Sequence, residues 1–322
     1  MGIFDFMEIS SSKILTVLGP TAVGKTAFAA HLAHLLDGEI ISADSRQVYR
    51  GMDIGTGKDY EDYKVEGKPV PAHLIDILDA GYEYNVYLFK QDFFKAFEDI
   101  SDRGKLPVLC GGSGMYIESV LKNYKLLHVP ADPGLRADLE EKDIMELEGM
   151  LKLYGPLHNQ TDVTSKKRII RAIEIAKHQS TSPEPSEENM ELNSLVFGIK
   201  LDRIIRRKRI TERLMNRLGQ GMVEEVEKLL AGGISHEKLD YYGLEYRYIS
   251  RYLRKELTYD VMVSRLNSAI HQFAKRQMTY FRGMERRGSK IHWIDGMLSM
   301  DKMTEEAMRI CRHDSGFQAL FT

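Results

Sequence analysis

The stretch that decides the fold is Gly19-Pro20-Thr21-Ala22-Val23-Gly24-Lys25-Thr26. It fits the phosphate-binding pattern G-x-x-x-x-G-K-[ST], which is informative where it joins a strand to a helix. That context is present, because residues 14–18 form a short apolar run and residues 25–36 have helical spacing. The glycines let successive backbone N–H groups point at phosphate oxygens, and the helix N-terminus adds partial positive charge. We therefore expect this turn to bind a diphosphate or a triphosphate.

The turn also predicts a cofactor but leaves the reaction open. Lys25 can bridge terminal phosphate oxygens, and the Thr26 hydroxyl is a ligand for Mg²⁺. A nucleotide hydrolase usually needs a second acidic residue after an apolar strand. Here the strand expected at residues 107–110 runs into Gly111-Gly112-Ser113, with no acid. The motif is equally compatible with a kinase and with another phosphate-releasing transferase.

The rest of the chain predicts an α/β protein with a helical addition. Strands are expected at 14–18, 39–42, 107–110, 195–200 and 290–294, and helices at 25–36, 87–102, 135–154, 165–178, 203–231 and 259–282. Residues 180–189 are polar and contain proline, which indicates a surface loop. We expect a P-loop NTPase-like parallel sheet core with a mainly helical insertion. The expected parts are a core at 12–125, a helical segment returning to the core at 126–200, an insertion at 201–275 and a C-terminal return at 276–322.

Composition indicates a soluble, cytoplasmic protein. The chain has 322 residues, 43% of them hydrophobic, and no apolar run long enough to span a membrane. Its first residues lack the basic start and apolar stretch of a signal peptide, and its two cysteines give no disulfide framework. The formal net charge is −2, yet basic residues gather at 166–171, 203–217, 247–255 and 275–290. Such segregation allows one face to bind a polyanion.

A second motif follows the strand at 39–42. Asp44 lies at the carboxyl end of this strand, which we expect to neighbour the strand of the phosphate-binding turn, so its carboxylate should face the phosphate site. It could organise Mg²⁺ or accept a proton from a nucleophile. Ser45, Gln47, Tyr49 and Lys58 have the varied hydrogen-bonding groups expected of a loop that binds a base.

Several segments in order carry a resemblance to a known family. They are GPTAVGKT, ISADSRQVYRGMDIGTGK, PAHLIDIL, LCGGSGMYIESVL, KKRIIRAIEI, RITERLMNRL and KRQMTYFRG, spread over residues 13–295. Together they closely resemble the tRNA dimethylallyltransferase family, also called tRNA isopentenylpyrophosphate transferases. The resemblance implies transfer of a dimethylallyl group from dimethylallyl diphosphate to N6 of adenine 37 in tRNA. It also implies a P-loop core with a helical insertion that contacts tRNA.

The resemblance assigns roles to individual residues. Asp44 matches the general base, Arg213 a residue that helps to bind the diphosphate, and Ser113 a hydroxyl near the reacting groups. The diphosphate would be bound by Gly19, Pro20, Thr21, Ala22, Val23, Gly24, Lys25 and Thr26. The tRNA would be bound by Asp44, Ser45, Arg46, Gln47, Lys167, Arg168, Arg171, Arg247, Lys275, Arg276, Gln277 and Arg282.

Two departures and three alternatives accompany this interpretation. Ser113 replaces the family's usual Thr, and residues 242–248 depart from a family segment that touches tRNA. His73 matches a family pattern, and we expect it to be structural because its spacing suggests no partner. One alternative is an adenylate dimethylallyltransferase, which the basic segments disfavour. A P-loop nucleotide kinase and a non-catalytic RNA-binding protein are the others. The expected oligomeric state is a monomer.

Overall fold

The computed structural model describes residues 13–155, 165–181 and 191–318. The chain forms two compact units, one made of Met1–Asn123 with Met190–Thr322 and the other of Tyr124–Asn189. Among the helices that the structure describes, none has the length and apolar character that spanning a bilayer requires. Of the surface loop expected at 180–189, residues 180 and 181 instead end a helix, and residues 182–189 lie outside the described residues.

The first unit is built on a parallel sheet of six strands in the order β5-β2-β6-β1-β7-β8. The strands are β1 (Lys13–Leu18), β2 (Gly38–Ala43), β5 (Ala72–His73), β6 (Leu106–Gly111), β7 (Asn193–Lys200) and β8 (Ile291–Asp295). A small antiparallel pair, β3 (Lys64–Val65) and β4 (Lys68–Pro69), lies apart from this sheet. Gly111 is paired with Leu18 on one side and Ala43 on the other. The carboxyl ends of β1, β6 and β2 therefore lie in one row.

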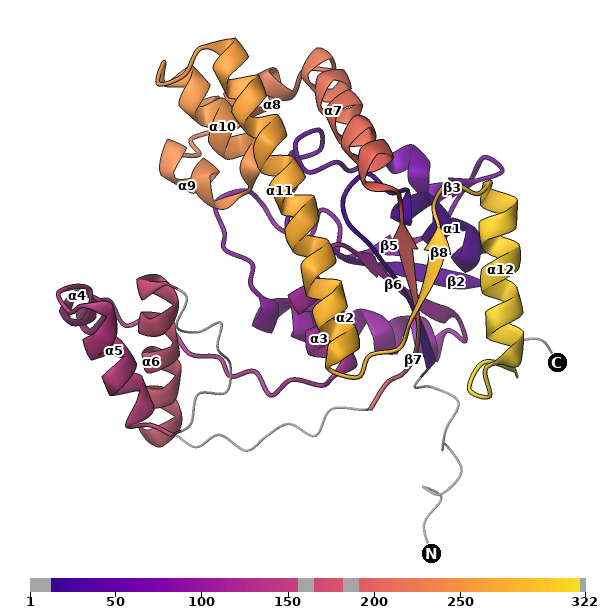
Figure 1. The fold of residues 1–322 in the computed structure, drawn as a ribbon, viewed down its shortest axis with the longest axis horizontal. Coiled ribbons are helices and arrows are strands. Elements are labelled where there is room, and N and C mark those ends of the chain that lie inside the picture. The colour runs from indigo at the N-terminus through magenta and orange to yellow at the C-terminus, as the bar shows by residue number, and fades with distance from the viewer. Residues whose placement is uncertain (1–12, 156–164, 182–190, 319–322) are drawn as a thin grey trace, which may run out of the picture. The chain divides into compact units, whose positions relative to one another are not determined.

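Helices cover both faces of this sheet (Figure 1). On one face, α1 (Lys25–Leu35) and α12 (Met300–His313) pack Phe28 and Ala307 against Val17 and Phe197 of the strands. On the other face, α2 (Val86–Asp102) and α3 (Gly114–Leu121) pack with α11 (Tyr259–Arg286). The same core continues into α7 (Arg203–Gly219), α8 (Met222–Ala231), α9 (His236–Tyr241) and α10 (Leu244–Leu253).

The second unit is a small group of helices with its own core. It contains α4 (Pro133–Glu140), α5 (Ile144–Lys152) and α6 (Lys166–Thr181), which bury Leu139, Leu147 and Ile169 together. Glu174 of α6 is buried and accepts hydrogen bonds from Arg136 and Arg171. Burial alone would raise the pKa of Glu174, but these bonds hold it at about 2. The ionised Glu174 carboxylate therefore stabilises the folded state of this unit near neutral pH.

The fold class expected from the sequence is confirmed, with three corrections of detail. The helix expected at 203–231 is two helices, because Gly221 has a left-handed backbone (φ 99°) and begins α8. The helix expected at 135–154 is also two, because Asp143 and Glu146 form a capping box that begins α5. The strand carrying Asp44 does not neighbour the strand of the phosphate-binding turn, because β6 lies between β2 and β1.

Candidate active site

A cavity of about 350 Å³ opens at the carboxyl ends of β1, β2 and β6. This is the edge of a parallel sheet at which ligands bind, and the volume is in the range of small-molecule sites. The cavity is lined by many residues that the sequence assigned to the site, namely Thr21, Ala22, Gly24, Lys25, Thr26, Asp44, Ser45, Arg46, Gln47, Ser113, Arg213, Arg247, Arg276 and Gln277. The row of strand ends thus brings the turn at residues 19–26 and the segment that begins at Asp44 to one cavity.

The phosphate-binding turn presents only part of its length to this cavity. Gly24 adopts φ 87° at the start of α1, a conformation that favours glycine. The Lys25 ammonium group donates to the Pro20 carbonyl at 3.1 Å, and burial lowers its pKa. Gly19, Pro20 and Val23 were assigned to the diphosphate but do not line the cavity. Val23 is instead buried in the core that α1 forms with the sheet.

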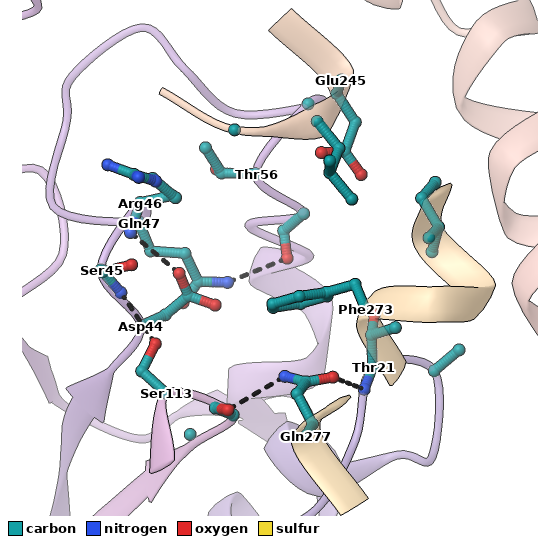
Figure 2. A pocket seen from close by; sticks show the side chains of 18 of the residues that line it. Thr21, Asp44, Ser45, Arg46, Gln47, Thr56, Ser113, Glu245, Phe273 and Gln277 are labelled. Carbon is teal, nitrogen blue, oxygen red and sulfur yellow. Dashed lines mark hydrogen bonds between the residues drawn. The ribbon is translucent and has the colours of Figure 1, made fainter. Parts of the chain in front are cut away.

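The segment after β2 forms the opposite wall (Figure 2). One oxygen of Asp44 accepts from the Arg46 N–H at 2.9 Å, and within the described chain the other has no hydrogen-bond partner. The Ser45 N–H donates to the Ser113 hydroxyl at 3.3 Å, which connects this segment to the end of β6. The Gln47 amide donates to the Gly57 carbonyl and accepts from Ser42. The second carboxylate oxygen of Asp44 is therefore available to accept a hydrogen bond from a ligand.

The loop at residues 53–57, of which Gly55, Thr56 and Gly57 line the cavity, is held in place by one buried carboxylate. Glu225 of α8 accepts hydrogen bonds from the N–H groups of Asp53, Ile54 and Gly55 at 2.7–3.0 Å. It also accepts from the Tyr246 hydroxyl at 2.7 Å. Consecutive N–H groups around one anion form a rigid nest. No local pattern in the sequence indicates this role for Glu225, since its partners are distant along the chain.

Two arginines of α7 approach the cavity from the helical part of the same unit. Arg213 and Arg217 donate to one oxygen of Asp59 at 3.0 and 3.1 Å. The Arg213 Nε is buried without a hydrogen-bond partner in the described structure. Burial and the nearby Arg213 lower the pKa of Arg217. Asp62, which also lines the cavity, has a pKa raised by burial and by Asp59. This pair of cations with an unsatisfied N–H is suited to a multiply charged anion.

One wall of the cavity comes from α11. Gln277 accepts from the Thr21 N–H at 2.9 Å and donates to the Gly112 carbonyl at 3.0 Å. Both ends of its amide are thus used to join the phosphate-binding turn to the end of β6. The Phe273 ring points into the cavity (Figure 2), and Arg276 lies over this ring at 5.9 Å. Across the site, Arg46 lies 4.6 Å from the ring of Tyr241.

Several residues assigned by the sequence lie elsewhere. Lys275 and Arg282 do not line this cavity, and Lys167, Arg168 and Arg171 belong to the second compact unit. The base-binding role expected of Tyr49 and Lys58 is not supported, because both are buried away from the cavity. Lys58 forms ion pairs with Asp53 and Asp76 there. His73, expected to have no partner, contacts Glu39 at 2.7 Å.

The sequence missed several side chains that line the cavity. These include Asp62, Arg217, Tyr241, Glu245 and Phe273. Burial raises the pKa of Glu245. Only Arg217 had a usable signal, because it follows Arg209 and Arg213 at intervals of four on one helix face. The aromatic residues have no motif that separates them from core positions.

The fold is a P-loop-like α/β fold, and its cavity is lined by residues of the glycine-rich turn and by Asp44. The model of the IPP transferase family matches residues 47–284, and the chain belongs to this family. A tRNA dimethylallyltransferase 1 from Parabacteroides distasonis is 56% identical over 302 residues, which are 94% of this chain and 98% of that protein. The resemblance first indicated by the motifs is thereby confirmed.

Solved structures agree with this assignment. The tRNA isopentenylpyrophosphate transferase of Bacillus halodurans superposes with a TM-score of 0.70 at 30% identity, covering 96% of this chain and 98% of that one. A eukaryotic dimethylallyltransferase described as acting on tRNA gives a TM-score of 0.71 at 20% identity, over 94% of this chain and 78% of that one. The second likeness concerns the fold alone.

Proposed function

We propose that this chain transfers the dimethylallyl group of dimethylallyl diphosphate to N6 of adenine 37 in tRNA and releases diphosphate. The observation that carries the proposal is that one cavity combines Lys25 and Arg213, suited to a diphosphate, with the free carboxylate oxygen of Asp44. The high identity to a relative named tRNA dimethylallyltransferase supports the same reaction. We also propose that the protein is cytoplasmic and acts as a monomer.

The diphosphate would bind between the turn and α7. Lys25 and Thr26 line the cavity from the turn, and Arg213 and Arg217 line it from α7. Negative charge on the diphosphate increases as the allylic carbon–oxygen bond breaks, so cations held in place stabilise the transition state more than the ground state. The unpartnered Nε of Arg213 is a donor that a phosphate oxygen would satisfy.

The residues present also fit a magnesium ion. Thr26, which carries a hydroxyl, and Asp62, which carries a carboxylate, both line the cavity. Throughout the described residues no group of three or more His, Cys, Asp or Glu side chains is placed to hold a metal. That agrees with Mg²⁺ bound by one hydroxyl, phosphate oxygens and water. When bound, the ion would neutralise charge on the diphosphate.

Asp44 would act on the acceptor amine. The bond between the allylic carbon and the diphosphate oxygen breaks with its electron pair left on oxygen, and the N6 lone pair forms the new bond to carbon. The amine then carries an extra proton, which passes to the free oxygen of Asp44. The Arg46 N–H bond to the other oxygen keeps the carboxylate in position. Ser113, which fixes the neighbouring Ser45, would position this segment.

The adenine must leave its stack to reach this carboxylate. Phe273 and Tyr241 line the cavity and offer ring surfaces for the extruded base. Arg46, Arg247 and Arg276 line the same opening and would contact the adjoining RNA. The roles of Lys167, Arg168, Arg171, Lys275 and Arg282 in tRNA binding remain part of the proposal.

A product assay tests the proposal. Purified protein with Mg²⁺ and labelled dimethylallyl diphosphate is offered unmodified tRNA, the same tRNA with guanine at position 37, and AMP. Label in the first tRNA and not in the second is the expected result. Label in AMP would identify an adenylate dimethylallyltransferase instead. Transfer to none of them would refute the proposed reaction.

A further inference from the structure

A second cleft lies between α7, α11 and the carboxyl ends of β7 and β8. It is lined by Lys200, Leu201, Asp202, Arg203, Arg206, Arg207, Ile210, His271, Gln272, Lys275, Met278, Thr279, Arg282, Glu285, Trp293 and Asp295. It has a volume of about 810 Å³, larger than the reaction cavity. None of its residues lines the cavity of Asp44 and Lys25.

The cations that line this cleft outnumber its acids. Within the described residues, no carboxylate forms a salt bridge with Arg203, Arg206, Arg207, Lys275 or Arg282. The acids present are used otherwise. Asp202 accepts from the N–H groups of Ile204 and Ile205, Glu285 accepts from the Trp293 indole, and Asp295 accepts from the Met297 N–H. Burial and the neighbouring Arg203 and Arg282 lower the pKa of Arg206, as expected where like charges are held together.

Helix α11 separates the cleft from the reaction cavity. At 100° per residue, Lys275, Thr279 and Arg282 share one side of the helix, and Phe273 and Gln277 lie on the other. The two sets of lining residues divide in the same way, and even the neighbours Lys275 and Arg276 line different openings. The exposed ridge of α11 thus has cations on both sides.

The form of the site favours an extended anion. A compact phosphate site is usually built from free backbone N–H groups at a helix start. Here the N–H groups that begin α7 are occupied by Asp202. The cleft instead offers long, separate side chains on two helices, of which Arg203, Arg207, Lys275 and Arg282 are exposed. Such an array matches phosphates spaced along a nucleic-acid backbone.

We propose that this cleft is a second phosphate-binding site that takes backbone phosphates of the RNA strand beyond the nucleotide in the reaction cavity. The strand would cross the ridge of α11 between Arg276 and Lys275. The inference rests on the proposed function, because it takes RNA as the substrate. It adds Arg203, Arg206 and Arg207 to the residues that bind it.

The test is tRNA binding as a function of salt. The variants are Arg206→Gln, Arg207→Gln and the double change. The matched control is Lys208→Gln, which removes one exposed charge of α7 that pairs with Glu212 outside the cleft. We expect weaker binding by the variants, with the slope of log Kd against log salt reduced by about one for each phosphate that the variant no longer binds. The KM for dimethylallyl diphosphate and the kcat at saturating tRNA should not change.

Three results would overturn the inference. One is a double variant with the same Kd and salt slope as the control. Another is loss of inorganic diphosphate binding in the double variant with tRNA binding intact, which would assign the cleft to a free polyphosphate. The third is a wild-type protein that does not bind tRNA. A protein that binds tRNA through these arginines but transfers nothing would refute the proposed reaction and leave the cleft supported.

Discussion

The carboxylate of Glu225 offers a stringent test of how the reaction cavity is held in shape. Each of its oxygens accepts two hydrogen bonds, one from Asp53 and Ile54 and the other from Gly55 and Tyr246. In Glu225→Gln, one oxygen becomes an NH₂ group that faces two donors. At least two hydrogen bonds to a charged acceptor are removed, each contributing about 1.5–3 kcal/mol. The expected destabilisation is about 3–6 kcal/mol, either of the whole fold or of the ordered loop.

The loop connects this destabilisation to function. Its Gly57 carbonyl accepts from Gln47, and Gly57 lies against the guanidinium groups of Arg213 and Arg217. A displaced loop would therefore disturb both the two arginines that we propose to bind the diphosphate and the segment that contains Asp44. We expect kcat/KM to fall at least about tenfold, which corresponds to about 1.4 kcal/mol of transition-state stabilisation.

Urea unfolding and transfer kinetics should be measured on the same preparations. The matched control is Glu224→Gln, the neighbouring exposed carboxylate of α8. Surface changes of this kind usually alter stability by less than about 0.5 kcal/mol. If Glu225→Gln behaves like Glu224→Gln in both measurements, the loop does not depend on this carboxylate. The reasoning would then be refuted.

Three further predictions concern the reaction cavity and the sheet beside it. Asp44→Asn keeps an acceptor oxygen but loses the base, so kcat in the transfer assay should fall about 10²–10⁴-fold while tRNA affinity, measured by filter binding, changes little. Gly57→Ala places a Cβ against Arg217 at a backbone of φ 72°, so KM for dimethylallyl diphosphate should rise, and an unchanged KM would contradict the packing. A hydrogen bond from Arg103 lowers the pKa of Glu39 to about 2, so its stabilisation is complete above its ordinary pKa of 4.5 and is lost as pH falls toward 2. Unfolding of Glu39→Gln should be less pH-dependent than that of wild type in this window.

Local motifs in the sequence predicted the phosphate-binding turn and Asp44. In both cases the chemically important residues follow directly after a strand. The motif and the strand before it can therefore be recognised in one short segment of sequence. In the structure, Lys25, Thr26 and Asp44 line one cavity. The predicted end of the helix beginning at 203 was wrong, because the helical spacing of apolar residues continues past Gly221. The left-handed backbone of Gly221 separates one helix from the next, and the spacing alone does not reveal it.

Contacts between distant segments could not be predicted. Gln277 was assigned to tRNA, yet its amide joins Thr21 to Gly112 across most of the chain. Lys58 suited a base-binding loop by residue type but is buried between two aspartates. In each case the residue type fits both roles, and only the packing of remote elements chooses between them.

Strand β6 lies between β1 and β2, and this order affects how far apart the two reactants would be held. With β6 between them, the strands that lead into the phosphate-binding turn and into Asp44 are two strand spacings apart, about 9–10 Å. The floor of this gap is the end of β6, where Gly111 and Gly112 have no room for a Cβ, since one would meet Ala43 and the other Gln277. A diphosphate at one side and a base at the other would thus approach each other over glycine backbone. We infer that the intervening strand sets the distance at which leaving group and acceptor amine are held, with the five-carbon group between them.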